Sequence, residues 1–212
     1  AYGRERVRAY LFIPKTSSPP SQTVVYFPAG DALFLRSSRD LRMNTTDFLI
    51  QSGRAVLYPV YKGTYERSRD AGSGPSAVRD LMIQRSKDLS RSLDYLATRA
   101  DMDMTRVGYY GISTGAIAGV VSTVIEPRFR ASVLLGVGLE TFQTAPEVDV
   151  WNFAPRVRVP TLMVNAKADF GYPIETSQLP LFRALGAEHK DHVLFEGGHI
   201  PVRIHEMIKV IL

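Results

Sequence analysis

The sequence predicts an α/β protein with a mostly parallel central sheet of about seven strands, covered by helices on both faces. Short runs of β-branched and aromatic residues alternate along the chain with longer segments of helical periodicity. Such alternation is typical of a parallel sheet whose crossover helices cover both of its faces. The 212 residues, of which 45% are hydrophobic and 22% charged, suffice for one domain with a full-sized core. We therefore expect residues 1–212 to form a single domain.

The expected strands and helices follow one another along the chain, separated by turns rich in Gly, Pro and Ser. The strands are residues 7–13, 24–27, 55–60, 107–110, 131–136, 161–165 and 192–195. The helices are residues 40–51, 80–99, 114–126, 176–185 and 200–212, with Ser38 as the cap of the first and an irregular loop at 61–77. Because parallel sheets bind ligands at the carboxyl ends of their strands, functional residues are expected at that edge.

The charge and hydropathy patterns argue against two classes of partner. Lys and Arg outnumber Asp and Glu by 26 to 21, and the closest basic runs, at 4–8 and 36–40, include acidic residues. A nucleic-acid-binding protein usually clusters its basic residues on one element, so we expect no nucleic-acid partner. No apolar stretch reaches the roughly 18 residues that a membrane span needs, so we expect no membrane partner.

The absence of cysteine limits the chemistry that the chain can perform. It excludes disulfides, a thiolate nucleophile and a metal held by cysteine. It also fits a reducing compartment, so we expect a cytoplasmic protein. The chain begins with Ala1, without a signal-peptide pattern and almost directly on a strand, which predicts that it is a piece of a longer protein.

The segment Gly111-Ile112-Ser113-Thr114-Gly115 has the Gly-x-Ser-x-Gly pattern of a nucleophile elbow. It follows an apolar strand and opens a helix, as such an elbow requires. The sharp turn would present the Ser113 hydroxyl at the sheet edge, and bulky residues two positions away would collide with the neighbouring strand and helix. The pattern thus predicts Ser113 as a nucleophile, with the Thr114 N–H at a helix N-terminus as an oxyanion donor.

A serine nucleophile needs a general base, and His199 is the histidine best placed to be one. It follows the strand 192–195 and the break at Gly197-Gly198, at a strand's carboxyl end like Ser113. Imidazole can take and return the serine proton near neutral pH. The other histidines have structural explanations: a charged turn, the start of a strand and the last helix. They are His189, His192 and His205.

The base is expected to be oriented by a carboxylate, and Asp169 occupies the expected place. In this arrangement the chain order is serine, acid, histidine, and Asp169 lies after the strand 161–165 and before the last strand. Glu140, after the strand ending at 136, is the main alternative. Asp149 is a weaker one, and Asp191 lies at the wrong end of its strand.

The second oxyanion donor is expected in the loop Pro28-Ala29-Gly30-Asp31, after the strand 24–27. Pro28 has no N–H, so the donor must come from one of the other three residues, and we favour Ala29. Residues at the same edge of the sheet are candidates for the substrate pocket: Pro28, Gly30, Tyr61, Lys62 and Phe170.

Two interpretations stay open for several aromatic residues near this edge. The stretch 61–65 could wall a pocket or pack as a surface loop. Trp151 and Phe153 lie between the strands 131–136 and 161–165, where a cap over the site would be inserted, and both a cap and a core role stay open.

Together these segments resemble a known family of enzymes. The resemblance rests on residues 26–28, 55–67, the elbow, 165–175 and Glu196-Gly197-Gly198-His199, of which the stretch 55–67 is the most specific to the family. They resemble the bacterial α/β-hydrolase domains related to dienelactone hydrolase and acetyl xylan esterase. The resemblance is greatest to the hydrolase domain found alone or fused behind bacterial serine/threonine protein kinases. It implies an α/β-hydrolase fold with a minimal cap and Ser113, Asp169 and His199 as a catalytic triad.

The residues and the resemblance lead to three hypotheses about activity. The favoured one is a serine esterase that acts on a small-molecule, short-chain ester through an acyl-enzyme, with no metal or organic cofactor. The alternatives are a peptidase or amidase with the same triad and a non-catalytic interaction module. The resemblance also implies a fused or partnering signalling domain, and the sequence leaves a homo-oligomer open.

Overall fold

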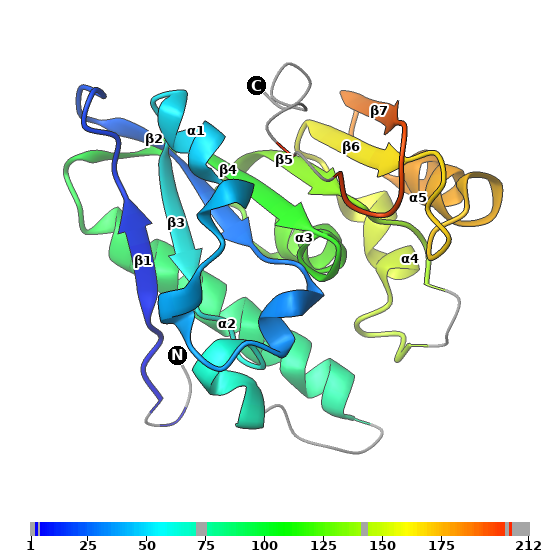
Figure 1. Ribbon diagram of the computed structural model, residues 1–212, viewed down its shortest axis with the longest axis horizontal. Helices are drawn as coiled ribbons and strands as arrows, with labels where there is room; N and C mark the ends of the chain where they lie inside the picture. The colour runs from blue at the N-terminus through cyan, green and yellow to red at the C-terminus, as the bar shows by residue number, and fades with distance from the viewer. Residues whose placement is uncertain (1–2, 4, 71–75, 141–143, 202–203, 205–212) are drawn as a thin grey trace.

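A seven-stranded sheet in the order β1-β3-β2-β4-β5-β6-β7 forms the centre of the molecule (Figure 1). The computed structural model describes residues 3, 5–70, 76–140, 144–201 and 204. The strands are β1 (Ala9–Phe12), β2 (Ser21–Phe27), β3 (Ala55–Pro59), β4 (Met102–Ile112), β5 (Phe129–Leu135), β6 (Thr161–Ala166) and β7 (Lys190–Phe195). β1 pairs antiparallel with β3, and the other neighbouring strands pair in parallel. The predicted fold class and the seven predicted strands are confirmed.

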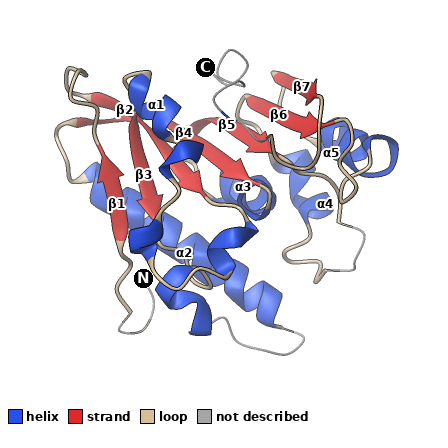
Figure 2. Ribbon diagram, in the orientation of Figure 1, coloured by secondary structure: helices blue, strands red, loops and turns tan. Residues whose placement is uncertain are grey.

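Both faces of the sheet are buried under helices (Figure 2). Because successive strand residues point to opposite sides, each strand contributes to two cores. On one face, Leu89 and Leu93 of α2 (Ala77–Ala97) pack with α3 (Thr114–Ile125). On the other face, Phe48 of α1 (Asp47–Gln51) packs with strand residues such as Tyr58. This arrangement leaves the carboxyl edge of the sheet as the place where loops can carry functional side chains.

The remaining helical segments are short. They are α4 (Val150–Phe153), α5 (Leu179–Ala184), a π-helical turn (Ile174–Gln178) and 3₁₀ turns at Gly30–Leu33, Ser38–Asp40, Met43–Thr45, Tyr65–Asp70 and Ala154–Arg156. α2 and α3 agree with the predicted helices 80–99 and 114–126 to within a few residues at their ends. Among the described helices, none combines the length and the apolar character that crossing a membrane requires.

The predicted helix 40–51 is wrong over its first half. Only residues 47–51 are α-helical, and two 3₁₀ turns precede them. Ser38 does not cap a helix, because its N–H and Oγ donate to the two carboxylate oxygens of Glu66 at 2.7 and 2.8 Å. Leu41 then leaves the helical conformation with ψ of 131°. A contact distant in sequence therefore overrides the local helical pattern.

The chain after β6 also departs from the predicted helix 176–185. The helix begins at Ile174 with the π-helical turn, in which the buried Gln178 side chain donates to the carbonyl oxygens of Ala166 (2.9 Å) and Tyr172 (2.7 Å). α4 was not predicted, and its cap is Asp149, which accepts a hydrogen bond from the Trp151 N–H. Most of the predicted helix 200–212 lies outside the described residues.

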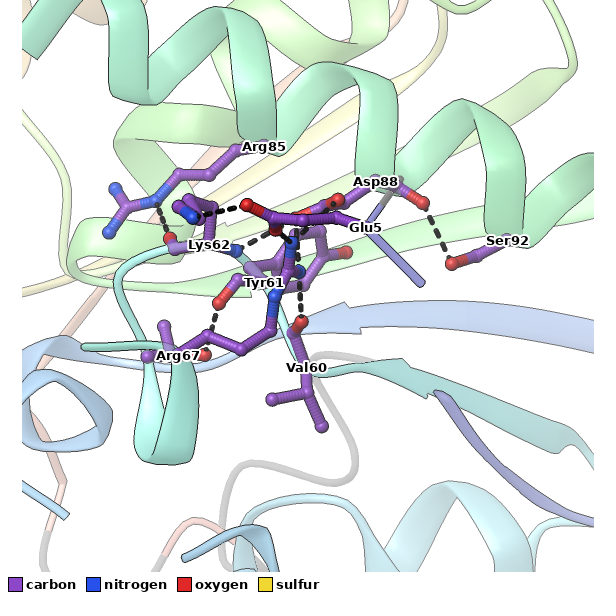
Figure 3. Close-up of polar contacts among 9 residues, drawn as sticks. Glu5, Val60, Tyr61, Lys62, Arg67, Arg85, Asp88 and Ser92 are labelled. Atoms are coloured by element: carbon purple, nitrogen blue, oxygen red, sulfur yellow. Dashed lines mark hydrogen bonds and ion pairs between the residues drawn. The ribbon is translucent and has the colours of Figure 1, made fainter. Parts of the chain in front are cut away.

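A buried cluster of charges joins the end of β3 to α2 (Figure 3). Asp88, which has no exposed surface, accepts hydrogen bonds from the Lys62 N–H (2.8 Å) and from Arg67 Nη1 (2.6 Å). Glu5 forms ion pairs with Lys62 (2.7 Å) and Arg67 (2.9 Å). Arg85 Nε donates to the Lys62 carbonyl oxygen at 3.0 Å, and burial lowers the pKa of Arg85 to about 10. The cluster fixes the path of the chain as it leaves β3.

We expect Asp88→Ala to lower the free energy of unfolding by about 3 to 5 kcal/mol, because it removes a carboxylate that neutralises the buried guanidinium of Arg67. Asp80→Ala, an exposed change on the same helix, is the control and should leave the urea midpoint nearly unchanged. Equal midpoints for the two variants would contradict a stabilising role for the cluster.

Candidate active site

A sharp turn between β4 and α3 carries Ser113. The residue has φ of 51° and ψ of −110°, a positive φ that non-glycine residues rarely adopt. A Cβ on Gly111 would lie 2.3 Å from the Gly115 carbonyl oxygen, and one on Gly115 would lie 2.2 Å from the Phe27 carbonyl oxygen. Only glycine fits at these two positions, as the elbow pattern predicts. The turn projects the Ser113 side chain from the carboxyl edge of the sheet.

Ser113, His199 and Asp169 are hydrogen-bonded in series. Ser113 Oγ and His199 Nε2 are 2.8 Å apart, and His199 Nδ1 and Asp169 Oδ2 are 2.6 Å apart. The loops after β6 and β7 are held together because the Lys167 N–H donates to the Phe195 carbonyl oxygen at 2.9 Å. The structure thus brings together three side chains that are far apart in sequence.

The carboxylate of Asp169 is buried and held by the backbone. Its side chain has no exposed surface, and Oδ1 accepts hydrogen bonds from the N–H groups of Gly171 (2.9 Å) and Tyr172 (3.1 Å). These bonds leave Oδ2 for the imidazole. A carboxylate fixed in this way orients the imidazole so that Nε2 faces the serine hydroxyl.

Two backbone N–H groups belong to the start of α3 and to the loop that packs against it. Thr114 is the first residue of α3, and Ala29 precedes the 3₁₀ turn at Gly30–Leu33. A Cβ on Gly30 would lie 3.2 Å from Thr114 Oγ1, so the loop lies against the helix start. Within the described part of the chain, neither N–H has a hydrogen-bond acceptor. Both groups are therefore available to bind an anionic oxygen.

A cavity of about 330 Å³ lies beside the elbow, although Ser113, Asp169 and His199 are not part of its wall. Its walls include Pro28 and Ala29, Ile112 just before Ser113, and Ile200 just after His199. Three tyrosines also line it: Tyr26, Tyr58 and Tyr65. The volume lies at the lower end of the range for small-molecule sites, about 300–1,000 Å³.

Solved structures share this architecture. No family model matches the sequence, and neither does any curated protein. A cold-adapted esterase from an Arctic intertidal metagenomic library is 20% identical with a TM-score of 0.74, over 97% of this chain and 85% of its own. The acetyl xylan esterase from Paenibacillus sp. R4 is 19% identical with a TM-score of 0.72, over 96% and 78%. The chain has the α/β-hydrolase fold.

A third solved structure has the same fold within a larger protein. A candidate dipeptidyl aminopeptidase IV from Bacteroides ovatus is 16% identical with a TM-score of 0.77, over 99% of this chain. The match covers 33% of that protein, so this chain corresponds to about a third of its length.

The other candidate acids of this α/β-hydrolase fold have different partners. Glu140 accepts a hydrogen bond from the Tyr172 hydroxyl at 2.8 Å. Asp149 caps α4. Asp191 is exposed on β7. None of the three has a hydrogen bond to His199 among the contacts of the described residues, so Asp169 is the carboxylate that the imidazole contacts.

Two of the remaining histidines, His189 and His192, have surroundings other than the elbow. His192 packs on the Phe182 ring with 5.3 Å between ring centres, and burial lowers the pKa of His192. His189 lies just before β7, at the amino end of that strand. His205 lies outside the described residues. Of the three described histidines, His199 is therefore the one at the elbow.

The pocket role predicted for Tyr61 and Lys62 is wrong. Tyr61 has no exposed surface and stacks on Phe27 with 3.9 Å between ring centres. The Lys62 ammonium is buried in the ion pair with Glu5 instead of lining the cavity. Burial of these side chains follows from the charge cluster, which pulls the start of the 61–77 loop against α2.

The other predicted pocket residues differ in their surroundings. Pro28 lines the cavity, whereas Gly30 packs on Thr114. The Phe170 side chain is 92% exposed and is absent from the cavity wall. Of the two residues with open roles, Phe153 packs on the core and Trp151 is 52% exposed.

Sequence reasoning did not identify the residues that support the site. Tyr172, which was not singled out, contacts Asp169 through its N–H and His199 through its ring. Tyr65 lines the cavity, which is one of the two interpretations left open for the stretch 61–65. Tyr172 follows Asp169 by three residues, a spacing at which a backbone N–H can reach a side-chain oxygen in a turn. This spacing is the feature of the sequence from which the contact between Tyr172 and Asp169 could be predicted.

We expect Gly111→Ala to lower the free energy of unfolding by about 3 kcal/mol, because its Cβ has no room beside the Gly115 carbonyl. Gly108→Ala, on the same strand, is the matched control, since its Cβ would meet Val24 at an ordinary 3.8 Å. Urea unfolding measures both. A Gly111→Ala protein as stable as Gly108→Ala would contradict the packing of the elbow.

Proposed function

We propose that the chain is a serine hydrolase that cleaves carboxylic esters through an acyl-enzyme. The observation that carries the proposal is the hydrogen-bonded series from Asp169 through His199 to Ser113, with distances of 2.6 and 2.8 Å. The series has the geometry of a nucleophile, a general base and an orienting carboxylate. It lies at the elbow, where the fold places reacting groups.

In the first half-reaction, Ser113 Oγ forms a bond to the acyl carbon of the ester. The serine proton moves to His199 Nε2, and the carbonyl π electrons move to the oxygen. When the tetrahedral intermediate collapses, the bond to the alcohol oxygen breaks and the imidazolium gives its proton to the leaving alcohol. Asp169 stabilises the positive charge that the imidazole holds between these two transfers.

In the second half-reaction, water replaces the alcohol. His199 accepts a proton from water as its oxygen bonds to the acyl carbon, and the proton returns to Ser113 Oγ when the acyl-enzyme bond breaks. The products are the carboxylic acid and the regenerated serine. The chemistry uses only side chains and backbone of this chain.

The negative oxygen of each tetrahedral intermediate is assigned to the N–H groups of Thr114 and Ala29. Both lack acceptors within the described residues, and the Thr114 N–H also lies at the positive end of the α3 dipole. Such donors act only on the charge that develops in the transition state, which is why they raise the rate rather than the affinity.

A small-molecule ester with a short acyl chain is the proposed substrate. The cavity beside the site is small, and tyrosines as well as aliphatic residues line it. Two of the structural neighbours carry the name of esterase, in support of the same choice. The cytoplasmic location, a fused or partnering signalling domain and a homo-oligomer stay predictions from the sequence.

Amide or peptide hydrolysis is the second candidate, favoured by the likeness to the dipeptidyl aminopeptidase structure. The same three residues would perform it. An interaction module without activity is disfavoured, because it would have no need of a fixed Ser–His–Asp series.

We expect Ser113→Ala to lower the hydrolysis of nitrophenyl acetate by about 10⁴-fold or more and to abolish labelling by a fluorophosphonate probe. Ser18→Ala, in an exposed turn at the opposite edge of the sheet, is the matched control and should keep full activity. Folded wild-type protein that neither labels nor hydrolyses any ester would refute the proposed function.

We expect nitrophenyl acetate and butyrate to be hydrolysed with a kcat/KM at least about tenfold above that of the laurate ester, because the cavity is small. The same assay includes a nitroanilide of matched acyl group. Faster turnover of the anilide than of the ester would favour the amidase instead.

A further inference from the structure

Tyr172 contacts both partners of the nucleophile, although it does not contact the serine itself. Its N–H donates to Asp169 Oδ1 at 3.1 Å, and its ring lies beside the His199 ring with 5.6 Å between centres. Its hydroxyl donates to Glu140 Oε1 at 2.8 Å. Backbone and side chain of this one residue thus connect the acid, the base and a second carboxylate in the segment after β5.

The position of Tyr172 is fixed from three sides. Its carbonyl oxygen accepts a hydrogen bond from the buried Gln178 side chain at 2.7 Å. A Cβ on Gly138 would lie 2.8 Å from Tyr172 Cδ1, so the ring packs directly against the backbone after β5. The tyrosine itself is only 8% exposed. A side chain held in this way can hold its neighbours in turn.

The imidazole needs such support because it is more exposed than the carboxylate that orients it. The His199 side chain is 29% exposed, whereas that of Asp169 has no exposed surface. Its other contacts include the backbone after β5, since a Cβ on Gly136 would lie 3.3 Å from His199 Cε1. The Tyr172 ring therefore limits rotation of the imidazole away from the serine.

We propose that Tyr172 and Glu140 are positioning residues for His199, with the tyrosine holding the imidazole and Glu140 fixing the tyrosine and adding a second negative charge near the imidazolium. The proposal rests on the function proposed above. It assigns Glu140 a role other than that of the triad acid, because its carboxylate is engaged by the Tyr172 hydroxyl.

The electrostatic part of the proposal is the effect of the Glu140 charge on the imidazole of His199. It follows from the groups around these two residues. Among the described residues, the titratable groups that a hydrogen bond or ring contact joins to Glu140 or His199, apart from Ser113, are Asp169 and Tyr172. Burial raises the pKa of Glu140, while the Tyr172 hydroxyl and the charge of His199 act in the opposite direction. Glu140 therefore gains its proton at a higher pH than an exposed glutamate does. When ionised, it favours the charged form of the imidazole.

Two near-isosteric variants separate the hydrogen bond from the charge. Tyr172→Phe keeps the ring and the N–H to Asp169 but removes the hydroxyl. Glu140→Gln keeps an acceptor for that hydroxyl but removes the negative charge. Glu175→Gln, an exposed change on the following π-helical turn, is the matched control.

We expect Tyr172→Phe and Glu140→Gln each to lower kcat for nitrophenyl acetate by about five- to tenfold with KM within about twofold, since neither side chain is assigned to the substrate. Because the two residues share one contact, the fold-change of the double variant should be smaller than the product of the two single fold-changes. Glu175→Gln should match the wild type.

The pH profile distinguishes positioning from a structural role. With the negative charge removed, the acidic limb of kcat/KM for Glu140→Gln should move to lower pH by about 0.5 unit, because less charge favours the protonated, inactive imidazole. Unchanged kcat and an unchanged acidic limb would overturn the proposal. So would a fall in melting temperature without a shift of the limb, or an effect confined to KM.

Failure of this inference is distinguishable from failure of the proposed function. Fluorophosphonate labelling of wild type and of each variant reports whether Ser113 is a nucleophile at all. Labelled, active protein whose Tyr172 and Glu140 variants behave like wild type overturns only the positioning role. Unlabelled, inactive wild-type protein overturns both.

Discussion

The close approach of α3 to the end of β2 is the packing contact on which the rest of the site depends. A Cβ on Gly115 would lie 2.2 Å from the Phe27 carbonyl oxygen, so the helix start and the strand end can touch only through glycine. The Tyr109 hydroxyl secures this contact by donating to the Gly115 carbonyl oxygen at 2.6 Å. Because β2 leads directly into the loop with Ala29, the same contact sets that loop beside the Thr114 N–H. Nucleophile and anion-binding groups are thereby placed by a single feature.

The base and its carboxylate depend on a second constraint, the parallel pairing of β6 with β7. Parallel strands end at the same edge, so the loops that follow them start side by side. Backbone hydrogen bonds then join the two loops, among them the one from the Ala168 N–H to the Gly197 carbonyl oxygen at 3.1 Å. The Asp169–His199 contact is thus an extension of the sheet, which explains how two residues on irregular segments reach 2.6 Å.

The charged side chains divide between support and chemistry according to what surrounds them. Asp88 and Asp169 are both buried carboxylates that accept backbone N–H groups. Asp88 faces Arg67, whose guanidinium is always charged, so the pair fixes the structure. Asp169 faces His199, which can gain and lose a proton, so the pair can take part in a reaction. Glu140 belongs to neither group, since it contacts the tyrosine that packs on the imidazole.

The sequence by itself determined the positions of the strands along the chain, the glycines of the elbow, and Ser113 and His199 as two members of the Ser–His–Asp series, because these depend on local periodicity, turn sterics and chain order. It did not determine which of several carboxylates meets the imidazole, since only packing at the sheet edge separates Asp169 from Glu140. The predictions of a helix over the first half of 40–51 and of a pocket role for Lys62 were also wrong, because Glu66 and Glu5 bind those segments from positions distant in sequence. Such contacts have no local signature. They exist only once the tertiary structure has brought the partners together.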